Sequence, residues 1–414
     1  MRARVILAAP GIRGEPSLVA AAMQAGVEVI RRPVDAADLL AAAAMEPTTA
    51  VVVGAELPRI SLDLIARLEP SRRRVIGLVD CGDSVDAGDS RTQRAQLEAF
   101  GLSDVVACQA EPAETMAQIA ALLVSHQDQS PLLQVASDTD VWEEIIPAGE
   151  GQLIAVWGPA GAPGRSAVAV ELSAELARRR QRTCTVDADT YAPALAMRLG
   201  VLDDVSGLIV ACRHADNGSL STRTLLSSTR LLDDRWYLLS GLGRSERWPD
   251  LRPAALERLW STCRKTFDRT VIDVGSCLEA GHPMSLPGFA VERNEASRSA
   301  LKRADGILAV TRPDALSMTR LLSALPQVRE LTPGTPVSIV MTHVERRDRR
   351  PARLRELLLR AGFDLPVNEI PVDARSYRRA LDRGSTVRQV APTSKSCRGV
   401  RDLAQVLVQA ASAA

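Results

Sequence analysis

Short apolar runs rich in β-branched residues alternate with Ala- and Leu-rich stretches along the first 125 residues. Five runs have the length and composition of buried strands: Arg4–Ala8, Val27–Arg31, Ala50–Val53, Val75–Val79 and Asp104–Ala107. Five helical stretches follow them in turn: Pro16–Ala25, Ala36–Ala44, Leu62–Leu68, Thr92–Phe100 and Pro112–Val124. Because such alternation builds a parallel sheet covered on both faces, the pattern predicts a flavodoxin-like or receiver-like α/β domain.

The rest of the chain divides into a polar segment and a second α/β pattern. Residues 126–150 have no sustained hydrophobic period and are predicted to be a linker. The strands expected beyond it are Leu153–Trp157, Thr183–Val186, Thr270–Ile272, Gly306–Val310 and Val337–Met341. The chain of 414 residues is therefore predicted to hold two α/β domains, over residues 1–125 and 151–414.

Composition excludes several classes of protein. The 51 Lys and Arg residues balance 50 Asp and Glu residues, so a uniformly basic nucleic-acid coat is excluded. The seven cysteines are scattered without a CxxC pair, which argues against a disulfide scaffold or zinc site and suits a reducing cytosol. No apolar run reaches the roughly 20 residues of a membrane span. We expect a cytoplasmic protein whose last helix, within residues 398–414, packs on the core.

The strongest chemical signal is the turn at residues 158–166, with the sequence GPAGAPGRS, between an apolar strand and a helix predicted over Ser166–Arg180. Binding of a phosphate requires inward-facing backbone N–H groups, a helix N-terminus and a cation, and Mg²⁺ needs a hydroxyl. Glycines allow the tight backbone, Arg165 provides a cation and Ser166 a Mg²⁺ ligand. The residues that we expect to bind phosphate are Gly158, Gly161, Gly164, Arg165, Ser166 and Ala167.

This turn departs from the usual phosphate-binding loop. Five residues rather than four separate Gly158 from Gly164, and arginine replaces the usual lysine. Pro159 and Pro163 remove two backbone donors, and a forked guanidinium does not simply replace a compact ammonium group. A tight strand-to-helix turn without a ligand is therefore the alternative interpretation.

Three carboxylates follow two of the predicted strands. Asp187 and Asp189 come at the end of one strand, and Asp273 comes at the end of another. The carboxyl ends of parallel strands meet at the sheet edge where ligands of open α/β sheets bind. One carboxylate could hold Mg²⁺ through water and another could orient an attacking water, whereas the alternative is that they cap the turns that follow.

The motifs together resemble the deviant-Walker ParA/MinD ATPases, and within them the CpaE/TadZ-like branch with a receiver-like front domain. The resemblance covers nearly the whole chain and is closest to the actinobacterial septum-site-determining or pilus-locus type. It rests on GPAGAPGRS, VDADTYAPALAMRLGV, FDRTVIDVG, RADGILAVTRPDALSMTRLLSAL and IPVDARSYRRALDRGSTVRQVAP. It implies that the second domain is a P-loop NTPase domain with a mostly parallel sheet.

The resemblance also implies ligands and residue roles. The ligands would be ATP or ADP with Mg²⁺, and Ser166 and Asp273 would hold the metal, directly or through water. Asp187 and Asp189 match an acidic motif implicated in positioning water and Mg²⁺, and Asp273 matches the Walker B carboxylate, so these three are the expected catalytic residues. Near the base the implied residues are Thr342, where the family often has an adenine-reading asparagine, and Pro371 and Asp373.

Two departures from the family bear on activity. Ala160 stands where the family has a lysine that reaches across a dimer, which predicts weak or absent hydrolysis. The front domain lacks the acidic residues and the lysine of a phosphorylated receiver, with Ala8, Ala9 and Glu56 near those positions. We therefore expect the front domain to dock a protein or to dimerise.

The leading hypothesis is a nucleotide-responsive positioning protein in septum-site placement or Tad/Flp pilus assembly. The resemblance implies a homodimer, protein partners in a pilus, secretion or division complex, at most peripheral membrane association, and recruitment to the cell pole, septum or inner membrane face. One alternative is an inactive scaffold that docks partners without nucleotide. Another is a chromosome-partition ATPase that binds DNA non-specifically through the arginines of residues 346–360, which the balanced net charge does not favour.

Overall fold

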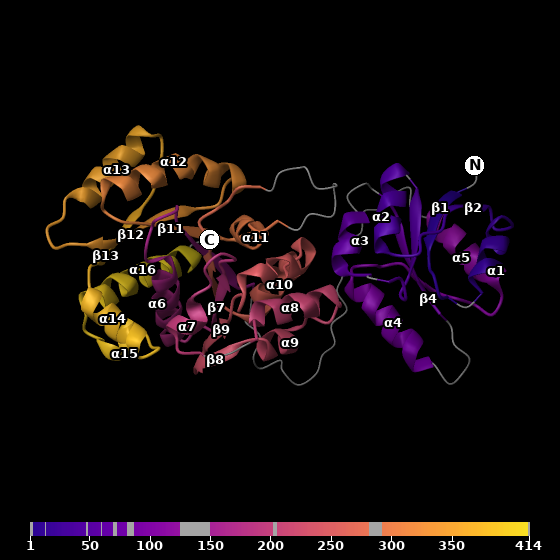
Figure 1. The fold of residues 1–414 in the computed structure, drawn as a ribbon, viewed down its shortest axis with the longest axis horizontal. Helices are drawn as coiled ribbons and strands as arrows, with labels where there is room; N and C mark the ends of the chain where they lie inside the picture. The colour runs from indigo at the N-terminus through magenta and orange to yellow at the C-terminus, as the bar shows by residue number, and fades with distance from the viewer. Residues whose placement is uncertain are drawn as a thin grey trace. The chain divides into compact units, whose positions relative to one another are not determined.

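The computed structural model describes residues 3–412, apart from residues 13, 47–48, 59, 69–72, 81–86, 125–149, 202–204 and 281–291. The chain divides into two compact units, each built around its own sheet (Figure 1). Almost all of the predicted linker lies outside the described residues, so the boundaries at 125 and 151 stay predictions.

The first unit is a five-stranded parallel sheet with helices on both faces, drawn in indigo and purple in Figure 1. Its strands are β1 (Ala3–Ala8), β2 (Val27–Arg31), β3 (Ala50–Gly54), β4 (Val75–Val79) and β5 (Val105–Ala107), in the order β2-β1-β3-β4-β5. Its helices are α1 (Glu15–Ala22), α2 (Ala36–Met45), α3 (Leu62–Leu68), α4 (Ala87–Ala99) and α5 (Pro112–Val124). Helices α1 and α5 share one apolar core with the sheet, and α2, α3 and α4 share the other. This is the doubly wound order that the alternation of strands and helices predicts.

The second unit is an eight-stranded sheet in the order β13-β12-β11-β6-β10-β7-β9-β8, parallel except for β8. Its strands are β6 (Gln152–Trp157), β7 (Thr183–Ala188), β8 (Arg230–Asp233), β9 (Trp236–Leu239), β10 (Arg269–Val274), β11 (Gly306–Thr311), β12 (Val337–Val344) and β13 (Val367–Pro371). The five strands expected from the sequence are all present, as β6, β7, β10, β11 and β12. Strand β6 lies between β10 and β11, so the loop that follows it opens near the middle of the sheet edge.

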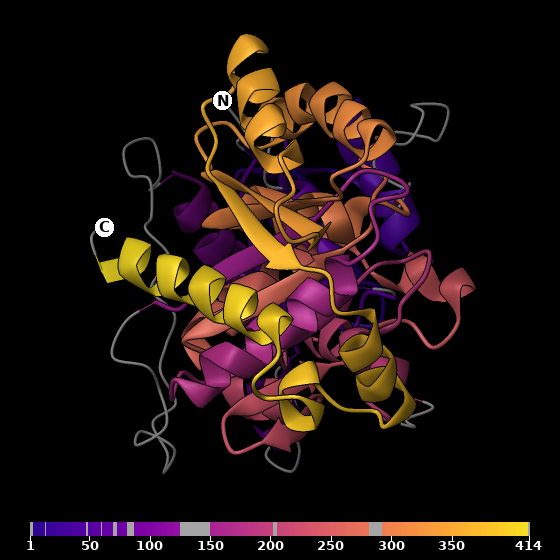
Figure 2. The ribbon, with the colours of Figure 1, turned by 90° about the vertical axis from the view of Figure 1, so that its left-hand side faces the viewer.

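Helices cover both faces of the second sheet. They are α6 (Arg165–Arg178), α7 (Leu195–Arg198), α8 (Gly207–Asp216), α9 (Thr222–Ser227), α10 (Pro253–Thr266), α11 (Glu295–Arg303), α12 (Ala315–Leu331), α13 (Arg350–Arg360), α14 (Ala374–Asp382), α15 (Val387–Val390) and α16 (Lys395–Ser412), with a 3-10 turn at Ser245–Asp250. Helices α6 and α16 lie side by side on one face (Figure 2), where Leu403 and Ala404 join the core. Core packing of the last helix, predicted from its weak basic and aromatic content, is confirmed. Across the described ranges, no helix combines the length and apolarity needed to cross a bilayer.

Candidate functional site

The glycine-rich loop joins β6 to α6 and positions the first turn of that helix. Gly164 precedes α6 with φ +109°, and Gly161 has φ +77°, backbone conformations that side chains other than glycine rarely adopt. A Cβ atom on Gly164 would lie 3.3 Å from the Cγ2 and Oγ1 atoms of Thr342. Since the first N–H groups of a helix have no intrahelical acceptor, the amides that follow Gly164 are available to an anion.

The other residues of the loop are held by neighbouring strands and helices. Position 158 has no room for a side chain, because a Cβ atom on Gly158 would lie 2.6 Å from the carbonyl oxygen of Val310 on β11. Arg320 of α12 reaches the loop from outside, and its Nη1 donates to the carbonyl oxygen of Ala160 at 3.1 Å. Sequence reasoning did not find Arg320, because nothing in the α12 pattern marks its contact with a distant loop.

Arg165 is bonded to protein groups. Its Nη1 donates to the carbonyl oxygen of Gly158 at 2.9 Å, and its Nη2 lies 3.5 Å from Oδ2 of Asp189. The guanidinium group therefore ties the start of α6 to the beginning of its own loop and to the loop after β7, in addition to placing a positive charge there.

Asp187 and Asp273 lie side by side at the ends of neighbouring strands. They are register partners on β7 and β10, and their exposed fractions are 1% and 2%. Oδ2 of Asp187 accepts hydrogen bonds from the backbone N–H groups of Ala194 and Leu195, at 2.9 and 3.0 Å. Asp187 therefore caps the start of α7, as the alternative interpretation of this motif expected.

Asp189 also holds its own loop. Its Oδ1 accepts from the backbone N–H groups of Tyr191 and Ala192, at 2.9 and 3.1 Å, while its Oδ2 faces Arg165. The structure thus brings the three predicted carboxylates to one sheet edge, with most oxygens of Asp187 and Asp189 already occupied.

Asp187 and Asp273 have raised pKa values. Burial raises the pKa of Asp187, and the neighbouring Asp273 adds to the shift because two close negative charges repel each other. Burial also raises the pKa of Asp273, whereas the Ser166 hydroxyl and the Arg165 charge act in the opposite direction. A cation bound beside them would relieve this repulsion.

Asp273 has the oxygen that fits a magnesium ion. Its Oδ1 is buried and makes no hydrogen bond in the described structure, and Ser166 lies beside the same carboxylate. An unpartnered buried carboxylate oxygen is unfavourable unless a ligand satisfies it. No cluster of three or more His, Cys, Asp or Glu side chains forms a metal site among the described residues. Mg²⁺ does not require such a cluster, because one or two protein ligands, water and phosphates hold it.

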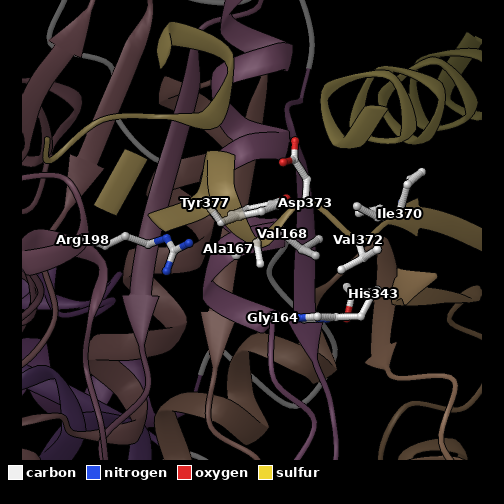
Figure 3. A pocket seen from close by; sticks show the side chains of 12 residues that line it. Gly164, Ala167, Val168, Arg198, His343, Ile370, Val372, Asp373 and Tyr377 are labelled. Carbon is white, nitrogen blue, oxygen red and sulfur yellow. The ribbon is translucent and has the colours of Figure 1, made fainter. Parts of the chain in front are cut away.

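Two cavities adjoin at the start of α6. The first, of about 300 Å³, is lined by Ala162, Pro163, Gly164, Arg165, Ser166, Ala167, Asp189, Ala192, Ala194 and Arg198. The second, of about 210 Å³, is more apolar and is lined by Gly164, Ala167, Val168, Arg198, Thr342, His343, Ile370, Pro371, Val372, Asp373, Ala374 and Tyr377 (Figure 3). Gly164, Ala167 and Arg198 line both, so the two cavities adjoin, and the first is the more polar of the two.

The three residues expected near the base all line the apolar cavity. The side chains of two of them, Thr342 and Asp373, already make hydrogen bonds to other protein groups. Thr342 Oγ1 lies 3.3 Å from the carbonyl oxygens of Pro163 and Thr311, to either of which it can donate. Asp373 accepts from the backbone N–H of Ser376 and the hydroxyl of Ser396, and its carboxylate points away from the centre of the cavity (Figure 3).

Sequence reasoning missed His343, Tyr377 and Arg198. His343 follows Thr342 directly in a left-handed backbone conformation, φ +59°, where the register of β12 with β13 shifts. Tyr377 comes from α14, and Arg198 ends α7. Such residues have no motif of their own, and their convergence depends on loops whose paths the hydrophobic pattern does not specify.

No family model and no curated protein matches this chain. Solved structures do match. A ParA family ATPase from Chlorobium tepidum is 17% identical, with 62% of this chain and 98% of that chain covered and a TM-score of 0.53. The cell division ATPase MinD from Pyrococcus furiosus is 21% identical, with 63% and 99% covered and a TM-score of 0.50. MinD from Pyrococcus horikoshii, solved with Mg-ADP, is 19% identical, with 63% and 97% covered and a TM-score of 0.49.

The first two similarities show the fold. The covered share exceeds what the first unit alone can supply, so the α/β fold with a mostly parallel sheet that these ATPases have is that of the second unit. The sequence identity is too low to carry more than the fold.

Proposed function

We propose that the second unit binds ATP or ADP together with Mg²⁺, and that the protein is a nucleotide-responsive positioning protein of the ParA/MinD type. The observation that carries the proposal is the pair of adjoining cavities at the start of α6. One is lined by Ser166, whose hydroxyl lies beside Asp273, and the other is more apolar. A nucleotide has the same two halves, a phosphate chain and a base. The two solved structures that support the fold are both described as ATPases.

The proposed roles follow from position. The backbone N–H groups from Gly164 to Ala167 would donate hydrogen bonds to phosphate oxygens at the N-terminus of α6. Ser166 and Asp273 would hold Mg²⁺, directly or through water, and the metal would neutralise phosphate charge when bound. Asp187 and Asp189 would fix the loop after β7, and with Asp273 would orient water at the site. Thr342, Pro371 and Asp373 would form walls of the base cavity.

We propose that hydrolysis is slow or absent. Ala160 offers no charged side chain at the loop, and the guanidinium of Arg165 is directed to Gly158 and Asp189. A transition state that develops phosphate charge would therefore receive less stabilisation than in a loop with free lysines.

The first unit is proposed to be a degenerate receiver-like domain that docks a protein partner. What supports this is its strand order together with the absence, in the sequence, of the acidic cluster expected for a phosphoacceptor. We place the protein in the CpaE/TadZ-like branch, as a homodimer acting in septum-site placement or pilus assembly, with peripheral recruitment to the pole, septum or inner membrane face. This part of the proposal rests on the sequence resemblance.

DNA binding is the less favoured function. The arginines of α13 are exposed, but Arg355 pairs with Glu369 and Arg360 pairs with Glu356. These pairs reduce the charge available to a phosphate backbone. A gel shift at low and moderate salt tests this alternative, because non-specific DNA binding weakens steeply as salt rises.

Calorimetric titration of the full chain with ATP and with ADP, each with and without Mg²⁺, tests the proposal. Wild type should bind with an affinity that Mg²⁺ increases, and Ser166→Ala should lose most of that increase. Phosphate release should be slow or undetectable. Absence of nucleotide binding by folded protein would instead support a scaffold that works without nucleotide.

A further inference from the structure

Arg198 occupies the junction of the two cavities. It is the last residue of α7 and lines both the polar cavity at the loop and the apolar cavity above it. Figure 3 shows its guanidinium group directed toward Ala167 and Tyr377, which line the apolar cavity. A ligand that fills both cavities has to pass this side chain.

The guanidinium group of Arg198 has no hydrogen-bond or ion-pair acceptor among the residues that the structure describes. The other two arginines near the loop differ. Arg165 donates to the carbonyl oxygen of Gly158 and faces Asp189, and Arg320 donates to the carbonyl oxygen of Ala160. Of these three cations, only Arg198 makes no side-chain hydrogen bond or ion pair within the described ranges, so its donors face a ligand there.

The charge of Arg198 already acts on the site at a distance. It favours the ionised forms of Asp273 and Glu171, two buried carboxyl groups that it does not contact by a hydrogen bond. A half-buried cation without a direct acceptor is a favourable place for an anion, because a bound anion restores the interactions that partial burial removes. The planar fork of a guanidinium group matches two oxygens of a phosphate.

We propose that Arg198 is the side chain that binds the phosphate chain of the nucleotide, whereas Arg165 chiefly holds the loop in shape. This inference rests on the proposed function, since it assigns a residue within the same site. It places the principal phosphate cation on the segment after β7, instead of at the loop position directly before Ser166.

Competition titrations against a fluorescent ADP analogue, with Mg²⁺ present, test the proposal. The competitors are ADP, AMP and adenosine, and the proteins are wild type, Arg198→Ala and Arg198→Lys. Arg379→Ala is the matched control, because Arg379 is exposed on α14 and lines neither cavity. Thermal unfolding of each variant establishes that it is folded.

Arg198→Ala should weaken the binding of ADP about 10- to 100-fold, the range expected for a charge-assisted hydrogen-bonded pair. It should weaken the binding of adenosine no more than about threefold. Arg198→Lys should recover part of the loss, and Arg379→Ala should bind as wild type does. Equal ADP affinity in wild type and Arg198→Ala would overturn the inference and leave the proposed function standing. An equal loss for ADP and adenosine would also overturn it, since that indicates a structural role. Absence of nucleotide binding in wild type would overturn both.

Discussion

Neutralising Asp273 should stabilise the ligand-free protein at high pH. Burial, with the charge of Asp189, raises the pKa of Asp273 to about 7. The Ser166 hydroxyl and the charges of Arg165 and Arg198 oppose the shift only in part. A carboxyl group with a raised folded-state pKa contributes stability that is fully present below its unfolded pKa and is lost as pH rises through the folded value. Wild type should therefore lose this contribution between about pH 4 and pH 7, and Asp273→Asn should not.

The size of the effect follows from the same shift. One pKa unit corresponds to about 1.4 kcal/mol, so the two pH units from pH 5 to the folded pKa give about 3 kcal/mol. Because Asp187 shares the repulsion, we expect the free energy of unfolding of Asp273→Asn, relative to wild type, to rise by about 2–3 kcal/mol between pH 5 and pH 8. Any effect of the amide group that does not depend on pH cancels when the stability differences at pH 5 and pH 8 are compared.

Urea unfolding at the two pH values, without Mg²⁺ or nucleotide, measures the difference. Val271→Ala, a truncation of a fully buried neutral residue on the same strand, is the control and should lose the same stability at both pH values. Asp273→Asn should also lose the Mg²⁺ dependence of ADP binding. A stability difference that stays constant or falls from pH 5 to pH 8 would refute the argument that this carboxylate is held at an electrostatic cost.

Two further changes test the backbone of the loop and a second buried carboxyl group. Gly164→Ala should lower the free energy of unfolding by about 1–3 kcal/mol in urea, because it combines a positive φ with contact to Thr342. Gly334→Ala, where φ is also positive but no atom lies within 4 Å, isolates the backbone effect and should cost less; equal losses would contradict the contact argument. Burial raises the pKa of Glu171 to about 7, so Glu171→Gln should gain about 2–3 kcal/mol relative to wild type from pH 5 to pH 8. Thermal or urea unfolding across that range checks it, and a pH-independent difference would contradict it.

Most strands predicted from the sequence are ones in which several consecutive apolar residues are buried. Strands β1, β3 and β4 consist largely of buried apolar residues, so their composition alone predicts them. In β2 only Val27 is fully buried, and its β-branched residues predict it. Strands β8, β9 and β13 were not predicted. Strand β9 is largely buried, but it has only four residues, too few to show a pattern in the sequence. In β8 no residue is fully buried, and in β13 only Ile370 is, because both are short edge strands whose ordering comes from a neighbouring strand. Their presence depends on tertiary contacts that a window of sequence does not contain.

Some features of the candidate site were also predictable from the sequence, and others were not. The meeting of Asp187 and Asp273 was predictable, since parallel strands bring their carboxyl ends to one edge. The bonding of Arg165 to Gly158 and the place of Arg198 between the cavities were not. Arginine at the end of a four-residue helix has no periodic signal, and its neighbours are set by the path of the loop after β7.

A crystal structure of the full chain grown with Mg²⁺ and ADP tests the central claim most directly. The account predicts phosphate oxygens on the backbone N–H groups from Gly164 to Ala167, Mg²⁺ near Ser166 and Asp273, and the base in the apolar cavity that Tyr377 lines. A nucleotide bound elsewhere on the chain, or these two cavities empty at saturating ADP, would contradict it.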